Sequence, residues 1–298
     1  MPWNRLLGPL DRLPADLALD DWYSELLGRA AGAAPLECAV LAGRLAATPG
    51  LAFLGGYQAA LRALWPAAPA GLGALCVSEG KRLRPADLAT RLDGLTLHGR
   101  KDFATAGDRA AWYLVGARDE PAGAPPRLAM TVVLAGAPGA RLEPMPPMPL
   151  IPDVPHARLV LDGAHCERLP GDGWDAYSKP FRCLEDVHVM AALLAWLYGV
   201  GLDSHWPREL ALRLVGLLGG CAEVLRHPVD AAETHLLLGG LFAQFDALAP
   251  ALDAAIAQGP AHWAQLWQRD RAVLALGGSA RAKRLDKAWA ALGLDPGQ

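Results

Sequence analysis

The sequence predicts an α+β protein with three successive regions: N-terminal helices, a small antiparallel β-domain (a barrel or sandwich) and a C-terminal antiparallel helical bundle. Ala- and Leu-rich segments with helical spacing fill both ends of the chain. Between them lie short segments rich in Val, Thr, Tyr and Trp, each bounded by a turn signal. We expect the regions to span residues 1–72, 73–172 and 173–298.

The first region contains three segments with helical spacing, at residues 16–30, 36–47 and 51–65. Prolines interrupt this pattern at Pro35 and Pro49, where we expect helix boundaries. The following segment "PAAPAGLG" is rich in turn formers, and it predicts the end of the helical region.

The middle region contains short runs typical of strands, separated by "LDG", "TAGD", "PAGAPP" and "GAPGA". No helical segment lies between these runs, which favours an antiparallel sheet or barrel. The runs span residues 74–78, 95–99, 111–117, 127–134 and 157–163.

The third region has long segments with helical spacing joined by short connections, which predicts an antiparallel bundle. In the second of these segments, apolar side chains form a single stripe from Leu210 to Cys221. The segments span residues 184–201, 207–225, 230–257, 261–276 and 280–292.

Composition narrows the class of protein. Hydrophobic residues make up 52% of the 298 residues, enough for a sizeable core, and a net charge of -3 argues against a nucleic-acid binder. The five cysteines are scattered, which predicts free thiols in a reducing compartment. We see neither a signal peptide nor a run of roughly 18 apolar residues. We therefore expect a cytoplasmic protein that does not span a membrane.

Three segments in the same order resemble the acyl-CoA dehydrogenase family. They are "LCVSEG" from Leu75, "LDGLTLHGRKDFATAGDRAAWYLVGAR" and "VPHARLVLDGAHCERLPGDGW". The resemblance covers about Leu75 to Gly201, in a chain shorter than a full member. It implies a flavoprotein that uses FAD to dehydrogenate an acyl-CoA or carrier thioester. It also implies a homodimer or homotetramer and an electron-transfer partner.

The resemblance assigns flavin contacts to five residues: Leu75, Val77, Ser78, Phe103 and Thr105. It implies that Phe103 packs on the isoalloxazine ring and that Thr105 and Ser78 donate hydrogen bonds to it. It also implies that Phe103 and Thr105 line a cleft against the C-terminal helices. From residue types alone, the same residues could be an ordinary core aromatic and ordinary strand hydroxyls.

The catalytic base is harder to assign. Dehydrogenation needs a carboxylate to take the α-proton. The late position where many members carry this Glu corresponds here to Gly277-Gly278. Some members carry it instead on the first bundle helix, where Glu185 lies, although Glu185 could simply favour that helix dipole. Glu185 and His188 also have the spacing of half a di-iron site, but no second such motif exists, so we expect no metal.

Several family features are missing, and they leave a second interpretation open. The small-residue loop that ends in Gly-Ser-Asp is replaced by a basic stretch with Lys81, Arg82 and Arg84, either a solvated loop or a phosphate contact. The family's pyrophosphate motifs have no good counterparts. FAD binding could therefore be weak or lost, and the alternative is a catalytically degenerate member that serves as a binding or assembly module.

Overall fold

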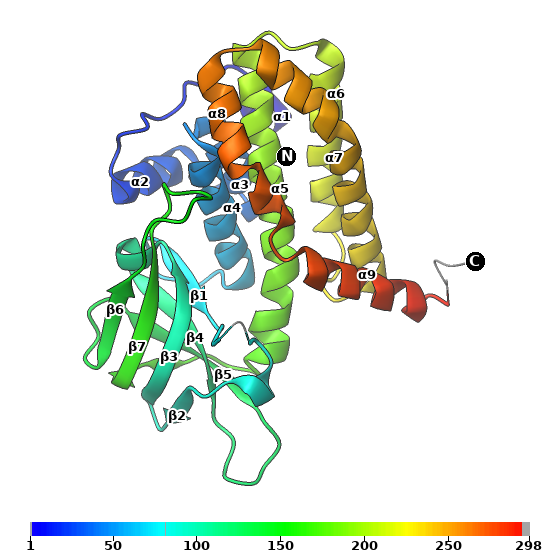
Figure 1. Cartoon of the computed structure of the whole chain (residues 1–298). Coiled ribbons are helices and arrows are strands. Elements are labelled where there is room, and N and C mark those ends of the chain that lie inside the picture. The colour runs from blue at the N-terminus through cyan, green and yellow to red at the C-terminus, as the bar shows by residue number, and fades with distance from the viewer. Residues whose placement is uncertain (1, 81, 294–298) are drawn as a thin grey trace.

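The computed structural model describes residues 2–80 and 82–293, and it contains helices, a sheet and helices in the predicted order (Figure 1). Pro35 and Pro49 each begin a helix, because the fixed φ of proline suits a first helical turn. Thr48 caps the last of these helices by accepting a hydrogen bond from the Leu51 amide at 3.2 Å. The N-terminal helices are α1 (Trp3–Leu7), α2 (Leu19–Arg29), α3 (Pro35–Leu45) and α4 (Pro49–Leu64).

The β-domain is a curled sheet with the order β6-β7-β3-β2-β4-β5-β8, and β1 pairs with β4. Most pairs are antiparallel, as predicted, but β1 and β2 run parallel to β4. The long β3 pairs with β7 along its length. The strands are β1 (Gly73–Cys76), β2 (Arg91–Asp93), β3 (Thr96–Thr105), β4 (Trp112–Arg118), β5 (Leu128–Leu134), β6 (Ala140–Pro144), β7 (His156–His165) and β8 (Glu167–Arg168), with 3-10 turns η1 (Pro85–Asp87) and η2 (Gly107–Arg109).

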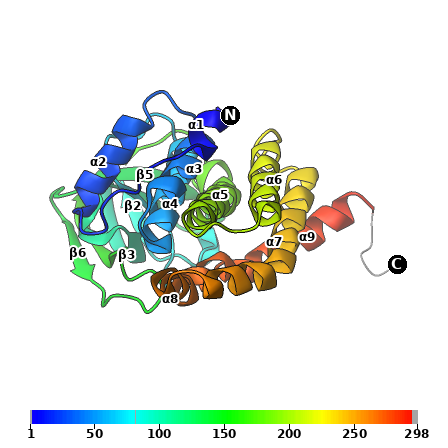
Figure 2. The ribbon, with the colours of Figure 1, turned by 90° about the horizontal axis from the view of Figure 1, so that it is seen from above.

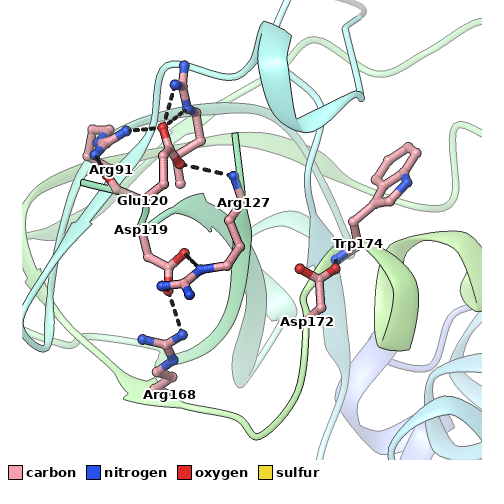
Figure 3. Close-up of polar contacts among 8 residues, drawn as sticks. Arg91, Asp119, Glu120, Arg127, Arg168, Asp172 and Trp174 are labelled. Atoms are coloured by element: carbon pink, nitrogen blue, oxygen red, sulfur yellow. Dashed lines mark hydrogen bonds and ion pairs between the residues drawn. The ribbon is translucent and has the colours of Figure 1, made fainter. Parts of the chain in front are cut away.

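Two acidic residues organise the far end of the β4–β5 hairpin (Figure 3). Glu120 is only 3% exposed and accepts hydrogen bonds from Arg91 at 2.7 Å, from Arg118 and from the backbone amide of Arg127. These donors lower the Glu120 pKa to about 2, against a desolvation cost that acts to raise it. Asp119 pairs with Arg127 and with Arg168, which joins the hairpin to β8.

The C-terminal region contains η3 (Trp174–Ser178), α5 (Lys179–Asp203), α6 (Arg208–Val224), α7 (Ala232–Gln258), α8 (Ala261–Asp270), η4 (Arg271–Ala275) and α9 (Gly278–Ala291). The predicted helix at 261–276 ends early, at Asp270. The Asp270 carboxylate is fully buried and accepts hydrogen bonds from the amide of Ile151 at 2.9 Å and from Arg269 at 2.8 Å. Beyond it, α9 lies against α7 and projects from the rest of the molecule (Figure 1).

The helix α5 is the centre of the fold, and α3 and α4 pack directly on its backbone (Figure 2). Two glycines allow this close approach. A Cβ at Gly43 would overlap the carbonyl oxygen of Ala192, and one at Gly56 would lie 2.7 Å from the carbonyl oxygen of His188. Both contacts are closer than real Cβ atoms tolerate, so α5 is held against its neighbours by backbone contact.

Two helical stretches, 174–203 and 232–258, are long and apolar enough to cross a membrane by length and composition. In the first, 83% of the most apolar window is buried inside the protein, against 28% in the second. Length and composition do not separate a membrane span from the core helix of a soluble protein. Of the two stretches, α7 therefore leaves the larger apolar surface uncovered in a single chain.

Candidate functional site

The predicted flavin contacts Phe103 and Thr105 are alternate residues of β3, so their side chains project from the same side of the strand. Phe103 is 42% exposed and meets the His156 ring edge-on, with 5.7 Å between ring centroids. Thr105 is half-buried rather than enclosed in the β-domain core. This exposed aromatic edge is compatible with the predicted ring contact.

The other three predicted contacts lie on or just after β1. The half-buried Leu75 donates its amide hydrogen to the Tyr57 hydroxyl at 2.8 Å. Val77 is 6% exposed, so its side chain belongs mainly to the core. Ser78 is half-buried, and its hydroxyl forms no hydrogen bond within the described part of the chain, whereas its carbonyl oxygen accepts from the Asp102 amide at 3.0 Å. A free hydroxyl at this position suits the predicted role as a donor.

A buried ion pair fixes the two strands that carry these residues. Lys101 is fully buried, and its ammonium group lies 2.5 Å from the Glu79 carboxylate and 3.4 Å from the Val77 carbonyl oxygen. Burial lowers the Lys101 pKa, and the charge of Glu79 opposes that shift. Glu79 also accepts from the amides of Ala89 and Thr90. The Lys and Glu of the two sequence motifs therefore tie the segment after β1 to β3.

Tyr57 of α4 connects the β-domain to the bundle, a role that no sequence pattern indicates. Its hydroxyl accepts from Leu75, and its ring meets Phe181 of α5 edge-on at 5.4 Å and stacks on Phe53 at 6.1 Å. Burial raises the Tyr57 pKa, and the charge of Glu185 adds to the shift. Tyr57 thus contacts both Leu75 of the predicted flavin edge and Phe181 of α5, the helix that carries Glu185.

A cavity of about 240 Å³ lies between α4, α5, α7 and the segment from η4 to α9. Glu185 and Gly277, from the two alternative positions for a base, both line it. The rest of the wall combines apolar side chains (Phe53, Leu83, Val189, Phe242, Val273, Leu274, Leu276) with charged ones (Arg182, Asp186, Arg281, Arg284). The cavity therefore places α5 opposite the C-terminal segment that carries the base in many members of the resembled family.

Glu185 is the carboxyl group of the cavity wall that has no partner among the described residues. Its carboxylate forms no hydrogen bond or ion pair within residues 2–80 and 82–293. Burial and the neighbouring charge of Asp186 raise its pKa to about 8, against the opposing effect of Arg182, Arg284 and Arg281. A carboxyl group with a pKa near the working pH is well suited to general-base catalysis.

Asp186, the other carboxylate of the cavity wall, is fully engaged. It pairs with Arg281 at 2.7 Å and with Arg284 at 2.6 Å, which attaches α9 to α5. Arg281 also donates to the carbonyl oxygens of Leu274 and Leu276. Burial raises the Asp186 pKa, and the two guanidinium groups oppose that shift. Because both of its oxygens are paired with arginines of α9, Asp186 is a structural residue here.

The other predicted features add neither a carboxyl group nor a metal site to this cavity. Gly277 caps α9 with a left-handed φ of 72°, and Gly278 begins the helix, so no carboxyl group comes from this turn. Arg82 and Arg84 lie on the exposed loop after β1, and Lys81 lies outside the described residues. His188 is buried and its Nδ1 lies 2.7 Å from the Leu184 carbonyl oxygen. Within the described residues, no His, Cys, Asp and Glu side chains group in a way that could hold a metal.

Solved structures of acyl-CoA dehydrogenase type share this arrangement of a curled β-domain between two helical regions. The FkbI structure "for Biosynthesis of Methoxymalonyl Extender Unit" of a polyketide has a TM-score of 0.67 at 21% identity, with 95% of this chain and 94% of that chain covered.

The FAD complex of PigA matches with a TM-score of 0.62 at 14% identity, over 94% of this chain and 91% of that one. Butyryl-CoA dehydrogenase from Megasphaera elsdenii matches with a TM-score of 0.57 at 14% identity, over 88% and 86%. No family model and no curated protein matches the sequence. The chain therefore has the acyl-CoA dehydrogenase fold, which confirms the predicted fold class and the resemblance at the level of structure.

Proposed function

We propose that this protein is an FAD-dependent oxidoreductase that dehydrogenates an acyl-CoA or carrier thioester between its α and β carbons, with Glu185 as the general base. The observation that carries this proposal is the unpaired Glu185 carboxyl group, with a pKa of about 8, in the wall of a cavity on α5. The five predicted flavin residues do not line this cavity, and Tyr57 is the residue that contacts both Leu75 of the predicted flavin edge and Phe181 of α5. Two structural neighbours suggest the reaction class, because one is an FAD complex and another is a butyryl-CoA dehydrogenase.

Two residues support the proposed contact with the flavin ring. Phe103 offers an exposed aromatic surface, and Ser78 offers a hydroxyl without a partner in the described part of the chain, whereas the Leu75 amide is engaged by Tyr57. When bound, FAD would accept the hydride that leaves the β-carbon. Glu185 would take the proton from the α-carbon, and the carbon–carbon double bond would form as these two bonds break. The apolar walls of the cavity would exclude water from the reacting carbons.

We further propose that FAD binds more loosely than in a typical member. The predicted ring-side residues are present in the sequence, whereas the family's pyrophosphate motifs have no good counterparts, and Arg82 and Arg84 lie on an exposed loop. The loss of two or three charge-assisted hydrogen bonds, each worth roughly 1.5–3 kcal/mol, weakens binding by several orders of magnitude. The visible spectrum of purified protein tests this. We expect a mostly colourless protein, and a stoichiometric yellow protein that survives dialysis would contradict it.

We also propose a cytoplasmic homodimer or homotetramer that passes electrons to a separate partner. The apolar α7, of whose most apolar window only 28% is buried in one chain, would be covered further by a second copy.

One observation favours the degenerate, non-catalytic alternative: the late base position is Gly278. Anaerobic bleaching of the flavin band with acyl-CoAs of different lengths decides between the two. Bleaching by any of them supports an enzyme. Protein fully loaded with FAD that no thioester bleaches supports a binding or assembly module.

A further inference from the structure

Arg182 is an ionised side chain without a partner inside the cavity. It lies one helical turn before Glu185 on α5, and both residues line the cavity wall. Its guanidinium group forms no hydrogen bond and no ion pair with any residue that the structure describes. Its aromatic neighbour is Trp174, whose ring centroid lies 5.1 Å from the Arg182 Cζ. Stacking on a ring face leaves the N–H donors of a guanidinium group unused.

The charges around the cavity do not balance. Three guanidinium groups, from Arg182, Arg281 and Arg284, face two carboxyl groups, from Glu185 and Asp186. Even with both carboxyl groups ionised, one positive charge is left over. Burial lowers the Arg182 pKa, the charge of Arg284 lowers it further, and the charge of Glu185 opposes these two effects. A half-buried guanidinium group that forms no ion pair is costly, and an anionic ligand would offset that cost.

We propose that this cavity takes a short acyl thioester whose far end carries a carboxylate, and that Arg182 binds that carboxylate. The proposal rests on the function proposed above, since it names the class of substrate for the same site. The planar guanidinium group matches a carboxylate with two parallel hydrogen bonds. The volume of about 240 Å³ lies below the roughly 300–1,000 Å³ of drug-sized ligand sites, which favours a short chain.

The spacing of the two side chains fits such a substrate. Residues three apart on a helix have Cβ atoms roughly 5–6 Å apart, so one extended ligand can reach both. With its α-carbon at Glu185, the ligand would present an acid group to Arg182 a few carbons away. A phosphate of the thioester carrier or of FAD has the same charge, but it belongs to a nucleotide, which is larger than the ligand that a cavity of about 240 Å³ is expected to hold. This favours the acyl carboxylate as the ligand of Arg182.

The test uses a matched pair of probes on the flavin-free protein. Monomethyl glutarate carries one carboxylate and an ester in place of the thioester, whereas methyl butyrate lacks the carboxylate. Isothermal titration calorimetry measures the affinity of wild type, Arg182→Gln and Arg182→Lys. Arg213→Gln is the control, because Arg213 lies on α6 with an exposed side chain paired to Glu209. Inorganic phosphate and pyrophosphate are titrated separately.

We expect monomethyl glutarate to bind wild type and Arg213→Gln at least tenfold more tightly than methyl butyrate does. Arg182→Gln should abolish this preference, and Arg182→Lys should restore part of it. Equal binding of both esters, or binding of only the phosphates, would overturn the proposal. These titrations involve neither flavin nor turnover. If anion binding is intact but no thioester bleaches the flavin, only the proposed reaction is contradicted. If a thioester bleaches the flavin but Arg182 shows no preference for the carboxylate, only the proposed substrate class is contradicted.

Discussion

Replacing Glu185 tests the proposed reaction most directly, because its pKa of about 8 predicts how the rate of flavin bleaching changes with pH. A base with this pKa is ionised to about one tenth at pH 7 and to about nine tenths at pH 9. The rate of flavin bleaching should therefore rise about tenfold between these pH values. Glu185→Gln cannot accept the proton, so the rate should fall roughly 10²–10⁴-fold and lose its pH dependence.

The same pKa has a consequence for stability that needs no flavin. A carboxyl group whose pKa is raised on folding holds its proton more tightly in the native state. Its contribution to the free energy of unfolding is complete below the unfolded pKa of about 4.5. That contribution is lost as the pH rises through about 8. Wild type should therefore lose stability towards pH 9, relative to Glu185→Gln.

The assay combines anaerobic stopped-flow bleaching of FAD-loaded protein with urea unfolding at pH 7 and pH 9. Glu209→Gln is a matched control, because Glu209 lies on α6 with its side chain 77% exposed. Bleaching that stays constant from pH 7 to pH 9, or that persists in Glu185→Gln, would refute the assignment of the base.

Two further predictions concern assembly and the β-domain. Light scattering at micromolar concentration should give a homodimer or homotetramer with an interface above about 1,000 Å² per dimer, and a monomer of 31.5 kDa would contradict this. Glu120→Gln should lower the free energy of unfolding at pH 7 by on the order of 2 kcal/mol, because Arg91 and Arg118 lose a buried charged acceptor. Since the Glu120 pKa is depressed on folding, wild type should approach the variant in stability as the pH falls from about 4.5 towards 2, measured by urea unfolding. The exposed pair of Glu143 and Arg141 is the control, and an equal loss in Glu143→Gln would count against the argument.

Local patterns predicted most of the elements. The spacing of apolar residues, together with the turn residues, located the helices and the long strands. The segment containing Phe103 and Thr105 is one continuous strand. The short β6 was missed, because "ARLEP" has little apolar alternation. The early end of α8 also escaped prediction, since it depends on the contact of Asp270 with the distant Ile151 amide.

The candidate site was predicted only in part. The motifs identified the β1 and β3 residues, and the helix position identified Glu185. Tyr57 and Arg182 carry no local signal, because their roles depend on which helix lies opposite them. A tyrosine with helical spacing is typical of any core, and an arginine near a helix start is typical of any surface. Whether the predicted site residues contact a cofactor or substrate stays a prediction.

The backbone contacts at Gly43 and Gly56 make the two sides of the cavity unequal. On one side, α5 cannot slide or rotate without driving its carbonyl groups into α3 and α4. On the other side, α9 reaches α5 through the flexible side chains of Arg281 and Arg284, which meet at Asp186. If the cavity is to accept a longer or bulkier acyl group, the wall formed by α9 with Arg281 and Arg284 must therefore be the one that moves. Selection for a new substrate would accordingly act first on the residues of η4 and α9, and would leave the glycines of the helical core unchanged.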